Sequence, residues 1–108
     1  MGEIKMNEKG SVNPVHPGEV ILEEFLKPLN ISQAKLALQM RVPQQRINEI
    51  VNGKRAITAD TALRLSVVFA GTTPEFWMSL QNKYDIRMAK RKNGERIARE
   101  ALPFEICT

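Results

Sequence analysis

Apolar residues recur at three- and four-residue steps along much of the chain, which is the period of an α-helix. The clearest stripe consists of Trp77, Leu80, Tyr84 and Met88. The pattern predicts five helices, over residues 17–27, 33–40, 43–51, 59–70 and 74–92. We therefore expect an all-α fold.

Residues with special backbone or capping properties mark the ends of these helices. Pro28 is predicted to close the first helix, and Gly53 to end the third in the left-handed conformation. The predicted N-caps, whose hydroxyls accept free backbone N–H groups, are Ser32, Thr58 and Thr73. The pair Asn93 and Gly94 is predicted to break the fifth helix.

The predicted helix ends and the residue pattern divide the chain into three regions. Residues 1–15 are polar and without sustained period, and we expect a flexible arm there. Residues 16–92 are expected to form one domain, and residues 93–108 a tail with one short helical turn and an extended end at residues 104–106. A chain of 108 residues is suited to a single core.

Charge and cysteine content narrow the class of protein. The formal net charge is +4, and the basic residues concentrate in residues 31–60 and 81–108, which permits nucleic-acid binding without establishing it. The single Cys107 excludes a disulfide within the chain. No apolar run approaches the roughly 20 residues of a membrane span, and we expect no membrane association. A soluble, cytoplasmic protein is the resulting expectation.

Residues 32–54 have the arrangement of a helix-turn-helix motif, in which two helices cross at a short turn. Ala37 supplies the small side chain needed where the helices approach most closely. The predicted apolar wedge between the helices consists of Leu36, Met40, Val42, Ile47 and Ile50. We therefore expect the motif to occupy about residues 32–52 of a phage-repressor-type, five-helix domain.

The outward positions of the third helix carry side chains suited to reading bases. They are Gln44, Gln45, Arg46, Asn48, Glu49 and Asn52, followed by the basic pair Lys54 and Arg55. Gln and Asn pair with adenine, Arg pairs with guanine or phosphate, and Glu accepts from cytosine. Gln33, at the start of the second helix, is a candidate phosphate contact. The alternative is an ordinary solvated helix face.

Residues 16 to about 91 resemble the HigA family of antitoxins, within the wider group of Cro and phage-repressor regulators. Three stretches carry the resemblance: residues 16–29, 47–65 and 74–81. It implies a homodimer that binds palindromic operator DNA, represses its own operon and neutralises a HigB-like, mRNA-cleaving toxin. It also implies base contacts by Gln44, Gln45, Arg46 and Asn48, and backbone contacts by Lys54 and Arg55. Arg41 stands where the group usually has glycine in the turn, and Val42-Pro43 where a Ser or Thr commonly caps the third helix.

Candidates for catalysis or metal binding are weak. His16 is the single histidine and is expected to be a structural turn residue, while Glu23 and Glu24 are expected to be solvated. Cys107 lacks a base and an oxyanion donor in the sequence. We expect neither an enzyme nor a bound cofactor or metal.

The aromatic stripe of the fifth helix has two possible roles, as core or as interface. Palindromic operators favour two-fold dimers, and we predict a dimer contact by Phe76, Trp77, Leu80 and Tyr84. A free-standing regulator without a toxin partner remains the alternative function.

Overall fold

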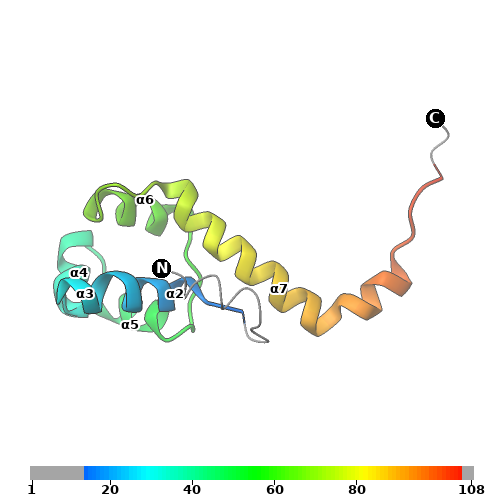
Figure 1. The fold of residues 1–108 in the computed structure, drawn as a ribbon, viewed down its shortest axis with the longest axis horizontal. Coiled ribbons are helices and arrows are strands. Elements are labelled where there is room, and N and C mark those ends of the chain that lie inside the picture. The colour runs from blue at the N-terminus through cyan, green and yellow to red at the C-terminus, as the bar shows by residue number, and fades with distance from the viewer. Residues whose placement is uncertain (1–13, 106–108) are drawn as a thin grey trace.

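The structure is a computed structural model that describes residues 14–105. Within this range every regular element is a helix: α2 (Pro17–Val20), the π-helix η1 (Ile21–Leu26), α3 (Lys27–Leu29), α4 (Gln33–Met40), α5 (Gln44–Val51), α6 (Ala59–Val68) and α7 (Pro74–Glu100). Because α2, η1 and α3 follow one another without a break, they form one segment, and the predicted all-α fold of five helical segments is confirmed. The shorter helices lie together at one end, and α7 extends away from them (Figure 1). Residues 1–13 of the predicted arm and 106–108 of the tail lie outside the described residues.

The first helical segment does not close at Lys27, as predicted, but continues to Leu29. Proline in a helix has no N–H to donate, and its ring clashes with the carbonyl four residues earlier. The turns before Pro28 are π-helical, with the Lys27 N–H bonded five residues back to the Leu22 carbonyl. We attribute the tolerance of Pro28 to this wider turn. The segment ends at Asn30, whose φ is 56°.

Helix α6 begins where predicted but ends two residues early, at Val68 rather than Ala70. The Thr58 hydroxyl caps it by accepting the Thr61 N–H at 3.3 Å. Phe69 leaves the helical conformation, with φ −108° and ψ 84°, and its ring lies 4.6 Å from that of Phe25. Burial of this aromatic side chain in the core therefore replaces the last helical turn.

Helix α7 is capped by Thr73 as predicted, but Asn93 and Gly94 do not break it, because the helix runs to Glu100. Glycine inside a helix costs only about 0.5–1 kcal/mol relative to alanine, and it keeps its backbone N–H. Arg96 and Glu100 form an ion pair at 3.6 Å one turn apart in the continuing helix. The predicted boundary between residues 92 and 93 therefore falls inside a helix, and Ala101–Glu105 form the non-helical end of the described chain.

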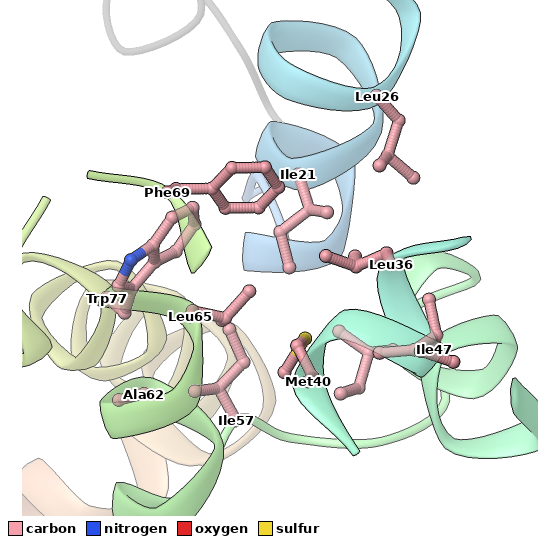
Figure 2. Packing of buried hydrophobic residues seen from close by; sticks show 12 residues of the cluster. Ile21, Leu26, Leu36, Met40, Ile47, Ile57, Ala62, Leu65, Phe69 and Trp77 are labelled. Atoms are coloured by element: carbon pink, nitrogen blue, oxygen red, sulfur yellow. The ribbon is translucent and has the colours of Figure 1, made fainter. Parts of the chain in front are cut away.

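The core lies between the first helical segment, α4 to α6 and the start of α7. Its buried apolar side chains are Ile21, Leu26, Leu36, Ala37, Met40, Ile47, Ile50, Ile57, Ala62, Leu65, Phe69 and Trp77. Figure 2 shows side chains from these different helices converging on one another. The Gln81 side chain joins the loop before α6 to α7, because its oxygen accepts the Ile57 N–H at 2.7 Å. One apolar core therefore holds α5 in place from several sides.

Gly18 allows α2 to lie directly against the C-terminal end of α5. A Cβ at this position would come within 1.7 Å of the Ile50 carbonyl oxygen, a backbone atom that cannot rotate away. Only a residue without a side chain fits there. The backbone of the first helical segment thus sets the position of α5.

Gly18→Ala is expected to lower the free energy of unfolding by about 3 kcal/mol, the upper end of the usual cost of overpacking, because the two backbones must separate. Urea denaturation followed by circular dichroism measures this loss. The matched control is Gly94→Ala in α7, where a Cβ would meet only the Lys90 Cβ at 3.8 Å. That variant should gain about 0.5–1 kcal/mol. Equal stability of Gly18→Ala and the natural chain would contradict the close contact.

Candidate nucleic-acid interface

Helices α4 and α5 form the predicted helix-turn-helix, joined by residues 41–43. The Ser32 hydroxyl caps α4 by accepting the Lys35 N–H at 3.0 Å, as predicted. Ala37 is buried at the crossing, and its carbonyl accepts the Val42 N–H at 3.1 Å across the turn. The small residue and the apolar wedge therefore lie where the sequence placed them.

Arg41 adopts the left-handed conformation that glycine usually supplies, with φ 61° and ψ 45°. This conformation costs a residue with a side chain about 1–2 kcal/mol. The Arg41 and Val42 N–H groups bond back to carbonyls of the last turn of α4, which satisfies that helix end. Arginine thus adopts the left-handed turn conformation, and these backbone hydrogen bonds help to offset its strain.

Helix α5 starts without a side-chain cap. Pro43 occupies the N-cap position, and its carbonyl accepts the Arg46 N–H at 3.0 Å. Ile47 and Ile50 are buried against α4 and the core, which turns the opposite face of α5 outward. Gly53, with φ 75°, follows the helix in the left-handed conformation as predicted.

Most of the predicted base-reading residues lie together on this outward face. Exposed side chains are Gln44, Gln45, Asn48, Asn52, Lys54 and Arg55, while Gln33, Arg46 and Glu49 are half-buried. The Asn48 amide donates to the Gln33 Oε1 at 3.2 Å, which links α5 to the N-terminus of α4. The Asn52 amide donates to the Asn48 carbonyl at 2.9 Å. The face is therefore an ordered surface rather than a set of independent side chains.

Glu49 lies at the centre of a second set of contacts. Its Oε1 accepts from the Arg55 Nε at 2.7 Å, and its Oε2 accepts from the Gln45 Nε2 at 3.1 Å. The hydrogen bond from Arg55, and then that from Gln45, lowers the pKa of the Glu49 carboxyl below its ordinary value. The carboxylate form is thus stabilised.

Arg46 is directed away from these contacts. Its guanidinium Nη1 lies 3.9 Å from the Asp60 carboxylate at the start of α6, and the side chain is half-buried. Arg46 therefore lies beside the first turn of α6 and not among the hydrogen-bonded amide side chains of α5.

The predicted dimer residues divide between core and surface. Trp77 is 0% exposed and contacts Phe25, and its Nε1 donates to the Thr72 hydroxyl at 3.0 Å. Its assignment to an interface was wrong, because the protomer's own core surrounds the indole. Phe76 is 40% exposed, and Leu80 and Tyr84 are half-buried.

His16 is a structural residue, as the sequence suggested. Only 9% of it is exposed, and its Nδ1 accepts the Gly18 N–H at 2.9 Å, which caps α2. Its ring meets that of Tyr84 edge to face at 4.8 Å, so it also joins α2 to α7. Burial lowers the pKa of His16, and the nearby Asp85 carboxylate partly opposes this effect.

The protein is expected to lose up to about 1 kcal/mol of stability, the usual worth of an N-cap, as the pH falls through the titration of His16. Below the ordinary imidazole pKa of about 6.5 the unfolded chain binds a proton that the folded chain excludes, which favours unfolding. Protonation also removes the Nδ1 acceptor of the cap. Urea unfolding between about pH 7.5 and 5 measures the effect.

His16→Asn is the control for this titration, because an asparagine oxygen can cap α2 without titrating. Its stability should change less over the same pH range. Identical pH profiles for the natural chain and His16→Asn would contradict the assignment.

Residues 14–105 offer no group of three or more His, Cys, Asp or Glu side chains that could hold a metal ion. Within the same residues no helix is long and apolar enough to span a membrane.

Sequence reasoning missed two features of this site. One is the contact of Gly18 with the end of α5, which depends on a crossing of helices remote in the chain. The other is the pairing of Glu49 with Gln45 and Arg55. The four-residue spacing of Gln45 and Glu49 indicates the contact between these two side chains, since such positions are neighbours on a helix. The contact with Arg55 has no such signal.

Known proteins are similar to this chain over the helix-turn-helix and the helices around it. A family model described as helix-turn-helix matches residues 22–77, a range that contains α4, α5 and α6. Virulence-associated protein I of Dichelobacter nodosus is 46% identical over 83 residues, which are 77% of this chain and 76% of that protein.

Two solved structures are similar over most of the chain. An addiction module antidote protein of the HigA family from Coxiella burnetii has a TM-score of 0.81 at 48% identity, covering 86% of this chain and 100% of that one. Antitoxin HigA of Pseudomonas aeruginosa, solved with the higBA promoter, has a TM-score of 0.82 at 41% identity, with 86% of this chain and 100% of that one covered.

Proposed function

The chain belongs to the helix-turn-helix family and to its HigA antitoxin group, and we propose that it binds operator DNA and represses the operon that encodes it. The ordered amide face of α5 carries this proposal. It combines exposed Gln45 and Asn48 side chains with a buried opposite face that holds the helix rigidly. The P. aeruginosa antitoxin, at 41% identity, was solved with a promoter. Binding rather than catalysis is therefore the activity we assign.

In this proposal α5 enters the major groove with its outward face toward the base edges. Gln44, Gln45 and Asn48 carry the amides that pair with adenine. Lys54 and Arg55, which follow α5, contact the phosphate backbone, and Gln33 at the N-terminus of α4 contacts a neighbouring phosphate. Arg46 is the least suited of the predicted base contacts, because it lies beside Asp60.

We also propose that the protein acts as a homodimer through α7. A palindromic operator presents two equivalent half-sites, which a two-fold dimer matches. Phe76 exposes an aromatic ring next to the buried Trp77, and Leu80 and Tyr84 lie further along the same helix, each half-buried. Burial of these side chains against a second copy would give apolar association energy.

Toxin neutralisation is the further function that we propose from the resemblance to the HigA group. The partner is a small, basic, HigB-like protein encoded beside this chain. A free-standing regulator has the same DNA-binding face and lacks that partner, so the two functions differ only in the second protein.

Replacing Gln44 and Gln45 together by Ala is expected to relax base preference, since each good bidentate pair discriminates by about 1–3 kcal/mol. Affinity for random duplex DNA should change little. Lys54→Ala should instead weaken binding to all sequences alike and reduce the salt slope by about 1. Fluorescence anisotropy with operator and random duplexes over a salt series separates the two effects. Equal losses on both duplexes from the glutamine change would contradict base reading by α5.

Phe76→Glu is expected to shift the protein from dimer to monomer at micromolar concentrations, because a charge would enter the proposed interface. Sedimentation equilibrium measures the change. Val67→Glu, at an exposed apolar position of α6, is the matched control and should leave the dimer intact. A natural chain that is already monomeric would reject the dimer.

Co-expression with the neighbouring gene tests the toxin partner. An antitoxin should co-purify with the product of a small adjacent gene and restore growth of cells that express it. A chain that binds its operator but captures no neighbouring product is the free-standing regulator.

A further inference from the structure

The contacts of Glu49 assign it a role different from that of a base reader. Both of its carboxylate oxygens are already engaged within the protein, Oε2 with the Gln45 amide at 3.1 Å and Oε1 with the Arg55 guanidinium at 2.7 Å. A carboxylate that reads cytosine must accept from the exocyclic amine of the base. Here each of the two oxygens already accepts one hydrogen bond from a side chain of the same face, which uses about half of the acceptor sites of a carboxylate. Glu49 therefore acts on its neighbours before DNA arrives.

We propose that Glu49 is a positioning residue that fixes the orientation of the Gln45 amide and thereby selects adenine over guanine; the proposal rests on the DNA-binding function proposed above. A carboxylate offers only acceptors, so the Gln45 NH₂ group must face it. The amide oxygen and the second N–H of Gln45 then remain for the DNA. Rotating the amide by half a turn would place its oxygen against the carboxylate, which is repulsive.

The groups left on Gln45 match adenine and oppose guanine. Adenine presents an N6 donor and an N7 acceptor, which pair with the amide oxygen and the remaining N–H. Guanine presents acceptors at both O6 and N7, so the outward amide oxygen would face the O6 oxygen. An amide that is free to rotate could instead turn its NH₂ group toward both guanine acceptors. Discrimination between the two purines thus requires a fixed amide, and Glu49 fixes it.

The surroundings of Glu49 support this role. Its side chain is 29% exposed and lies one helical turn beyond Gln45, the spacing at which side chains on one helix face meet. Arg55 approaches from the loop after α5, and the ion pair holds the carboxylate on the side of Gln45. The lowered pKa of Glu49 keeps it ionised, and therefore an acceptor only, at neutral pH. Arg55 retains its terminal amino groups for a phosphate.

The test compares base preferences, using the full chain and a library of duplexes with a randomised segment. Selection and sequencing on the natural chain and on Gln45→Ala first identify the position at which Gln45 prefers adenine. Glu49→Ala should lose the adenine-over-guanine preference at that same position, where a good bidentate pair gives about 5- to 150-fold. The double variant should lose no more than either single variant. Glu49→Gln, which keeps one acceptor oxygen, should give an intermediate preference and provides a second variant if Glu49→Ala fails to fold.

Affinity for random duplex DNA distinguishes positioning from a general structural role. Removing a carboxylate from a face that approaches phosphates should raise this affinity a few-fold. A fall by the same factor on operator and random duplexes would overturn the proposal. So would a loss of cytosine preference at a different position with the Gln45 position intact, because Glu49 would then read a base itself. If the natural chain shows no base preference at all, the proposed DNA-binding function fails as well, and the two failures are thereby distinguished.

Discussion

The outward face of α5 depends on one constraint, the direct backbone contact between the first helical segment and the end of α5. Gly18 has no side chain, and the Ile50 carbonyl occupies the space that a Cβ would need. The neighbouring His16 caps α2 and contacts Tyr84 of α7. The end of α5 is therefore held against α2, and α2 is in turn held against α7. A helix that must present several side chains to DNA at once needs such a rigid support.

The outward face of α5 shows how a polar surface can be ordered before it binds. Gln33 holds Asn48, and Glu49 holds both Gln45 and Arg55. These bonds are exposed, so each contributes little to folding stability. Their effect is instead to reduce the number of orientations that each amide can adopt. Less side-chain freedom is then lost on binding, and an amide in one orientation distinguishes bases that a rotating amide does not.

Helix α7 serves two regions of the molecule. Its first turns supply Trp77 to the core and Gln81 to the loop before α6. Its later turns extend away from the other helices (Figure 1). Most of the side chains in these turns are exposed. Within the first turn itself, Phe76 and Trp77 lie on different faces of the helix, because adjacent positions on a helix point about 100° apart. One ring is surface and the other is core, although both belong to one aromatic cluster in the sequence.

The sequence alone determined which segments are helical, their side-chain caps and the turn between α4 and α5, but not where every helix ends. Ser32, Thr58 and Thr73 cap as predicted, and the inward positions of α4 and α5 followed from the apolar period, because these are local properties of the chain. Only the tertiary structure decided what depends on neighbours remote in sequence. It ended α6 early by burying Phe69, assigned Trp77 to the core and required glycine at position 18. The continuation of α7 through Gly94 is instead a local property, since the modest helix penalty of one glycine yields to an otherwise favourable helix. The hydrogen-bond partners of the side chains on the outward face of α5 could not be predicted from the sequence. Several polar groups compete there, and the crossing of the helices selects among them.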